Sequence, residues 1–156
     1  MKQRLIDFTA VVLLMLITGV FWGTWFTLTR SLEDFSAEEF THIGKVIIAN
    51  VAMPMRILMP SGILLVLLSL WFHRHKKTTG FFMGVLSFIL IIVVLLITLV
   101  VLVPIDNDIK EWTSATVPAN WEALRDKWKL FHALRTFTSL LSFTLFSWYA
   151  LTDNAD

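Results

Sequence analysis

The chain alternates between long apolar stretches and short stretches that hold nearly all of its charges. A membrane-spanning helix needs about 20 mostly apolar residues to cross about 30 Å of hydrocarbon. Four stretches meet this requirement, and the spans are expected at residues 8–28, 51–72, 81–103 and 132–151. The pattern therefore predicts one domain over residues 1–156, an all-α integral membrane four-helix bundle.

The second span is the least regular of the four, because it contains Arg56 and two prolines, Pro54 and Pro60. The residues Ser36-Ala37-Glu38-Glu39 have the order of a capping box, in which serine and glutamate satisfy the first backbone groups of a helix. This predicts a long helix that starts at Ser36 and stands partly above the membrane. The prolines should kink it near the surface.

The orientation follows from the short loops, since cytoplasmic loops carry the excess of lysine and arginine. Lys2 and Arg4 precede the first span, and the loop of residues 73–77 is short and basic. We therefore expect a multi-pass protein of the cell membrane with both termini in the cytoplasm. A cleaved signal peptide is the alternative for the first span, but the apolar run is long and no small-x-small cleavage site follows it.

Composition removes several classes of function. The 13 basic and 12 acidic residues leave a net charge of +1, so no basic surface predicts a nucleic-acid partner. The chain has no cysteine, which excludes disulfides and thiolate sites. The spacing of its histidines does not favour a metal site. Gly19 and Gly23 form a Gly-x-x-x-Gly pair, which we interpret as packing within the bundle, with a homo-oligomer as the alternative.

One face of the fourth span is polar. Its members follow one another at spacings of four and three residues: Trp121, Arg125, Trp128, His132, Arg135, Ser139 and Ser142. This is the spacing of a single helical face. The part of the face within the membrane cannot comfortably meet lipid, so it should look into the bundle.

The second helix offers a matching stripe at the same spacing: Glu38, His42, Lys45, Ala49, Ala52 and Arg56. We therefore expect a polar pocket between the second and fourth spans, in an outward-facing polar and aromatic layer. Asp106 is the expected counter-ion of the buried arginines. As alternatives, Arg56 and Arg135 extend to the lipid headgroups, and His132 is a packing residue.

Tryptophans gather in the same layer. Trp112, Trp121 and Trp128 flank Arg125 and His132 along the sequence. Tryptophan is enriched where a membrane meets water, so these three could form only an interfacial belt. Their clustering with charged residues also allows a flat, aromatic-lined cavity for a small molecule.

Two segments carry a resemblance to a known family. They are Val103-Pro104-Ile105-Asp106-Asn107-Asp108-Ile109-Lys110-Glu111-Trp112 and Pro118-Ala119-Asn120-Trp121-Glu122-Ala123-Leu124-Arg125-Asp126-Lys127-Trp128, the latter followed by Phe131-His132-Ala133-Leu134-Arg135-Thr136. This pattern resembles the anthrone oxygenase-like family of small four-span membrane proteins. The match covers the C-terminal third well and the rest by topology. Asp106 departs from the pattern, because the family more often has asparagine there, and only aspartate can act as a base or counter-ion.

The resemblance implies an oxygenase that oxidises an anthrone, or a related lipophilic aromatic compound, with molecular oxygen and no cofactor. Such chemistry needs a base, for which we expect His132, and cations that stabilise the resulting anion, for which Arg135, Arg56 or Arg125 would serve. Asp106 completes the expected catalytic residues. His42, Asn107 and the three tryptophans are the expected substrate contacts.

A second hypothesis is an accessory membrane protein that binds a lipid, a small anion or a partner subunit through the same polar layer. A transporter is a third, but one polar layer in four spans provides no obvious path through the membrane. An enzyme should enclose its polar layer beside a cavity wide enough for rings. An accessory protein should instead pair Arg56 and Arg135 with Asp106.

Overall fold

The computed structural model describes residues 2–75, 78–113 and 115–152. Lys76 and Lys77 of the expected basic loop lie outside these residues, and the side chain of Lys2 is likewise not described.

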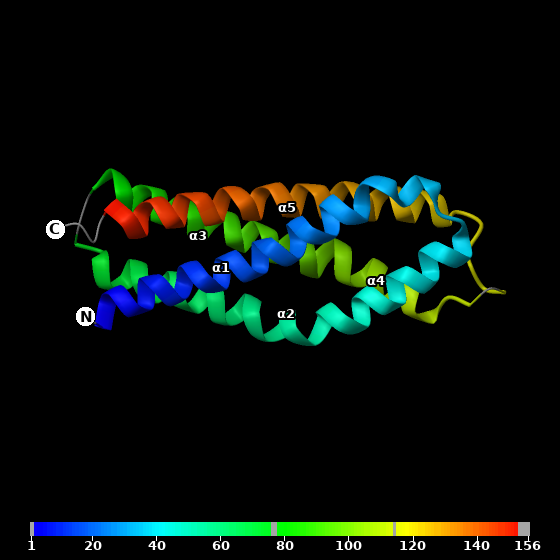
Figure 1. Ribbon diagram of the computed structural model, residues 1–156, viewed down its shortest axis with the longest axis horizontal. Coiled ribbons are helices and arrows are strands. Elements are labelled where there is room, and N and C mark those ends of the chain that lie inside the picture. Colours follow the sequence, from blue (N-terminus) through cyan, green and yellow to red (C-terminus); the bar gives the residue numbers. More distant parts are fainter. Residues whose placement is uncertain (1, 76–77, 114, 153–156) are drawn as a thin grey trace.

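The described residues form helices and no strands. In chain order the elements are α1 (Lys2–Thr27), the 3₁₀ helix η1 (Thr29–Asp34), α2 (Ala37–His73), α3 (Thr79–Ile97), the π-helical turn η2 (Thr98–Leu102), α4 (Val103–Glu111) and α5 (Trp121–Thr152). They lie side by side as a long bundle (Figure 1). Both termini and the α2–α3 connection lie at one end, here called the terminal end. Helix α4 and η1 lie toward the opposite end, here called the α4 end.

Apolar side chains both fill and cover the bundle. Leu14, Ile17, Val66, Ile91 and Phe146 are fully buried in its core. Large apolar side chains also cover its outside, among them Leu5, Phe72, Val100 and Leu151. A helical protein that is apolar inside and outside is suited to lipid rather than water.

Three helical segments are long and apolar enough to cross a membrane: Gln3–Asp34, Ala37–His73 and Thr79–Glu111. Helix α5 does not meet the same criterion, because many serines and threonines lower the hydropathy of its C-terminal part, but it runs alongside the other three (Figure 1). The predicted all-α membrane bundle is therefore confirmed. The fourth crossing at 132–151, the span limits and the cytoplasmic orientation remain predictions.

Helix α2 begins as predicted. The Ser36 hydroxyl accepts a hydrogen bond from the Glu39 backbone at 3.4 Å, and the Glu39 carboxylate accepts one from the Ser36 backbone at 2.9 Å. The helix continues through Pro54 and Pro60 and is bowed along its length (Figure 1). Prolines cause such bends because each one removes a backbone hydrogen bond.

The third span continues as a helix beyond its expected end at residue 103. The wide turn η2 leads into α4, with Pro104 in the first turn of α4, where its missing N–H is tolerated. Asp106 therefore stands on a helix that packs against η2 and α2. The expected connection of residues 104–131 is correspondingly shorter.

The expected neighbour of α5 is wrong. Helix α5 packs mainly against α3 and α1 and has little direct contact with α2. The periodic pattern identified the face of α5 that turns inward, but it could not identify which helices that face meets.

Candidate functional site

One face of α5 is polar and buried along most of its length. Its buried polar members are Arg125, His132, Thr136, Ser139 and Ser142. Ser142 and Ser87 of α3 each donate a hydroxyl to the other's backbone carbonyl, at 2.9 and 2.8 Å. Thr18 of α1 donates its hydroxyl to the Ser139 carbonyl at 3.3 Å. The inward orientation of this stripe is confirmed, and its partners are α1 and α3.

His132 is 1% exposed and lies at the centre of the polar layer. Its ring stacks on Trp128 with centroids 4.7 Å apart and planes 6° from parallel. Its Nδ1 lies 2.7 Å from a terminal guanidinium nitrogen of Arg135. A guanidinium can only donate, so Nδ1 accepts and the hydrogen of the neutral imidazole is on Nε2. This Nε2 makes no hydrogen bond of normal geometry within the described residues, although the Phe21 backbone lies near the ring.

Arg135 is held from three sides. Its guanidinium carbon lies 4.1 Å from the ring centroid of Phe21 on α1, which is a cation–π contact. One terminal nitrogen donates to His132 and the other to the Thr98 hydroxyl of η2, at 3.4 Å. Its Nε is buried and has no partner among the described residues. Besides this Nε and the His132 Nε2, the only such atom in the described residues is Ser147 Oγ.

Asp106 is joined to the layer through Trp128. The Trp128 indole N–H donates to one carboxylate oxygen of Asp106 at 2.9 Å. Within the described residues Asp106 forms no ion pair with Arg135, although it was the expected counter-ion. Asp106 and Trp128 also line a cavity of about 20 Å³, whose other walls are apolar side chains of η1, α2 and α4 and the segment between α1 and η1. That volume holds about one water molecule and cannot hold a ring system.

The other two tryptophans of the layer are packing residues. Trp112 and Trp121 lie against Phe40 of α2, with ring centroids 6.4 and 5.9 Å apart respectively. Together with Leu32 and Ile109 they belong to a second apolar cluster at the α4 end. Of the three tryptophans, only Trp128 borders the cavity beside Asp106.

Four expected site residues do not join His132 and Arg135. Arg56 and His42 are exposed on α2, so neither lies in a pocket with α5. Asn107 is exposed and accepts a hydrogen bond from Lys110 at 2.9 Å. Arg125 is buried but pairs with Asp126 at 2.9 Å and lies 5.2 Å from the Trp121 ring.

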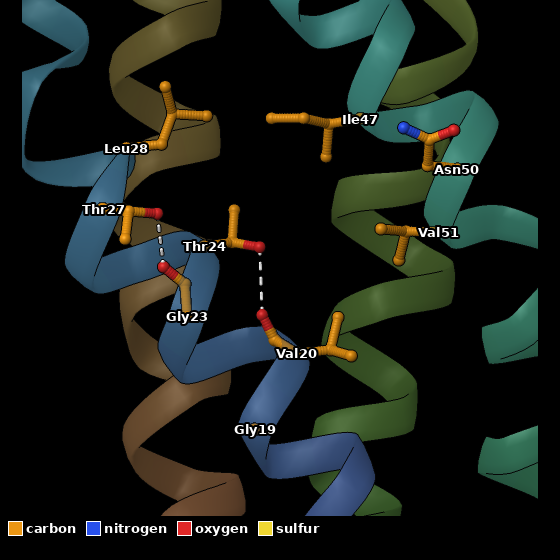
Figure 2. Close-up of a pocket in the computed structure, with 9 residues that line it drawn as sticks. All are labelled: Gly19, Val20, Gly23, Thr24, Thr27, Leu28, Ile47, Asn50 and Val51. Carbon is orange, nitrogen blue, oxygen red and sulfur yellow. Dashed lines mark hydrogen bonds between the residues drawn. The ribbon is translucent and has the colours of Figure 1, made fainter.

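A larger hollow lies between α1 and α2. This groove has a volume of about 400 Å³. Figure 2 shows its walls, which are Gly19, Val20, Gly23, Thr24, Thr27 and Leu28 on one side and Ile47, Asn50 and Val51 on the other. Leu28 and Ile47 also line the Asp106 cavity, so the two hollows are neighbours.

The terminal end holds a second buried polar cluster that sequence reasoning missed. The Ser69 hydroxyl donates to the Asp7 carboxylate and lies 3.1 Å from the Tyr149 hydroxyl. The Tyr149 hydroxyl is 2.7 Å from Nδ1 of His73, and the Gln3 amide donates to Nε2 of His73 at 2.8 Å. The available signal was an acidic residue at the start of an apolar span, together with serine and histidine four positions apart on α2.

The described residues contain no group of three or more acidic or histidine side chains placed to hold a metal ion. Contacts through Trp128 and His132 bring together three titratable groups at the α4 end, which are Asp106, His132 and Arg135.

The comparison with known families gives one match. The family model for anthrone oxygenase matches residues 47–145, from α2 to the later part of α5. The matched range includes the three groups just named and leaves out all of α1. No curated protein and no solved structure matched the chain.

Proposed function

This chain belongs to the anthrone oxygenase family, and we propose that it is a membrane-embedded oxygenase that converts a lipophilic anthrone-like compound to the corresponding quinone with dioxygen. The observation that carries the proposal is the group of Asp106, Trp128, His132 and Arg135, here called the α4-end layer. Trp128 connects the Asp106 carboxylate to His132, and the Nε2 of His132 and the Nε of Arg135 are buried donors without hydrogen-bond partners in the described residues. Buried polar atoms are normally satisfied, so unpaired donors of this kind are typical of a site that binds something else.

Asp106 is the proposed base, in place of His132. The Nδ1 lone pair of His132 is occupied by Arg135, and its Nε2 carries a hydrogen, so neither nitrogen is free to take a proton. Asp106 receives one hydrogen bond, from Trp128, and lies in a largely apolar surrounding. It would remove a proton from the methylene carbon of the substrate, and the electron pair would spread over the rings and the carbonyl oxygen.

His132 and Arg135 are the proposed anion-stabilising groups. The Nε2–H of His132 would donate to the oxygen of the anion. The positive charge of Arg135, which contacts His132, would stabilise the anion electrostatically. Phe21 and Thr98 fix the guanidinium, and Trp128 fixes the imidazole, so these groups need little rearrangement during the reaction.

The anion would then react with dioxygen without a cofactor. One electron passes from the anion to dioxygen, and the resulting pair combines to form a carbon–oxygen bond at the former methylene carbon. The peroxide takes the proton held by Asp106. Loss of the remaining hydrogen on that carbon, with cleavage of the oxygen–oxygen bond, gives the second carbonyl and water. One anthrone and one dioxygen thus give one quinone and one water.

The experiment is turnover of anthrone by the purified protein in lipid nanodiscs, with oxygen consumption and quinone absorbance recorded together. The proposal expects one dioxygen consumed per quinone, and one oxygen-18 atom in the quinone when labelled dioxygen is used. Empty nanodiscs measure the uncatalysed oxidation. Binding of anthrone without oxygen consumption above that background would overturn the oxygenase and favour the accessory role.

A further inference from the structure

We propose that the groove between α1 and α2 is the site where the ring system of a flat, lipophilic substrate binds, with its reactive edge directed past Leu28 and Ile47 toward Asp106. The inference rests on the proposed function and locates its substrate. The Asp106 cavity is too small for a ring system, but the groove beside it is not. The Asp106 cavity offers about 20 Å³, whereas the adjoining groove offers about 400 Å³, within the range of small-molecule sites.

Gly19 and Gly23 keep this groove open. Apart from the adjoining residues and backbone of α1 itself, no atom of the described chain lies within 4 Å of a methyl group added at either glycine, so the pair does not pack against another helix there. The expected role in packing within the bundle is therefore wrong. Gly62 and Gly84 show the contrast, because an added methyl group would meet neighbouring side chains at 3.0 and 2.8 Å.

The walls of the groove suit an apolar ring system. The hydroxyls of Thr24 and Thr27 donate to the carbonyls of Val20 and Gly23 in their own helix, at 3.0 and 2.6 Å, as the dashed lines of Figure 2 mark. These two side chains therefore present mainly methyl groups. Asn50 makes no hydrogen bond within the described residues, so its amide remains able to bind a polar substituent at the edge of the rings.

The position of the groove beside the Asp106 cavity favours a substrate molecule, rather than a helix of a second copy, as its occupant. Leu28 and Ile47 line both hollows, so the groove adjoins the cavity that Asp106 lines. Beyond them Asp106 accepts a hydrogen bond from Trp128, whose ring stacks on His132. The Nε2 of His132 and the Nε of Arg135 are buried and make no hydrogen bond within the described residues. A helix of a second copy could cover the glycines, but it would leave those buried donors without a partner.

The test compares three variants that add the same type of side chain. Gly23→Leu and Gly19→Leu fill the groove, and nothing within 4 Å of the new Cβ forces the backbone to move. Ala49→Leu is the matched control, because residue 49 is exposed on α2 and does not line the groove. Binding of anthrone is measured without oxygen, by quenching of tryptophan fluorescence, so that turnover is not required.

We expect Gly23→Leu to raise the Kd at least tenfold, Gly19→Leu to raise it several-fold, and Ala49→Leu to change it less than twofold. A smaller rise in Gly23→Ala, with an unchanged melting temperature, would confirm that filling the groove rather than misfolding weakens binding. Unchanged binding in both leucine variants would overturn the groove. A glycine variant that binds normally but loses a dimer in native mass spectra would assign the groove to a second copy.

The outcomes separate this inference from the proposed function. Binding that is lost in Gly23→Leu while the unsubstituted protein never turns over would leave the groove in place and remove the oxygenase. Turnover that persists unchanged in Gly23→Leu would leave the oxygenase in place and remove the groove.

Discussion

The bundle contains two buried polar clusters that have similar residues but differ in whether all their buried polar atoms have hydrogen-bond partners. The terminal-end cluster joins Asp7, Ser69, His73 and Tyr149, and no buried side-chain atom in these four residues lacks a partner. The α4-end layer also has an aspartate and a histidine, yet two of its buried nitrogens are unpaired. A fully paired network stabilises a fold, whereas a partly paired one is costly unless a ligand completes it. From this contrast we propose that the first cluster stabilises the fold and that the second binds the substrate.

Asp106→Asn should give the largest effect on activity. Asparagine keeps the size of the side chain and can still accept from the Trp128 indole, but it cannot take a proton. We expect kcat to fall about 100-fold or more, the usual contribution of a general base, with little change in melting temperature. Oxygen consumption with anthrone measures the first and thermal unfolding in detergent the second. Full activity in this variant would show that Asp106 is not the base.

Arg135→Lys should have the next largest effect. A lysine keeps the charge but lacks the planar fork that contacts His132 and Thr98 together. We expect kcat to fall about tenfold, because loss of one preorganised donor removes part of the stabilisation of the anion. Wild-type kcat in this variant would show that the fork is not needed.

Tyr149→Phe should lower stability and leave activity nearly unchanged, the opposite of what we expect for the variants at the α4 end. The change removes the hydroxyl that contacts Ser69 and His73 but keeps the buried ring. Leaving buried partners unpaired costs about 1–3 kcal/mol, so the melting temperature should fall. The value of kcat/KM should change less than twofold. A large loss of activity with unchanged stability would mean that the terminal-end cluster takes part in the reaction.

Arg56→Gln should have the smallest effect. Arg56 is exposed and makes no hydrogen bond or ion pair within the described residues. We expect kcat, KM and melting temperature all to stay within twofold or a few degrees of the unsubstituted protein. A loss comparable to that of Arg135→Lys would place Arg56 in the site after all.

The stripes that contain Arg135 on α5 and Arg56 on α2 show which parts of the site the sequence could predict. The spacing on α5 correctly predicted that His132 and Ser139 face inward, because polar side chains on a membrane helix are costly in contact with lipid. The stripe on α2 that ends at Arg56 was assigned to the same pocket, but the buried seam of α2 runs through Phe40 and Met59 instead. Apolar packing therefore decided which face of α2 is buried.

Other features depended on contacts between distant segments. The capping box at Ser36 and Glu39 is local, so the sequence was sufficient to predict it. The pairing of Asp7 with Ser69 and the open space beside Gly23 depend on how α1 lies against α2. Helical periodicity carries no information about that arrangement, which is why the terminal-end cluster and the groove were not predicted.

The central claim is that the α4 end removes a proton from its substrate and holds the anion. The most direct measurement is the absorption spectrum of anthrone mixed with the protein in the absence of oxygen. The account predicts a long-wavelength band of the delocalised anion with the unsubstituted protein, its loss in Asp106→Asn, and its decay to quinone when oxygen is admitted. Absence of the band in the unsubstituted protein, or an equal band in Asp106→Asn, would contradict the account.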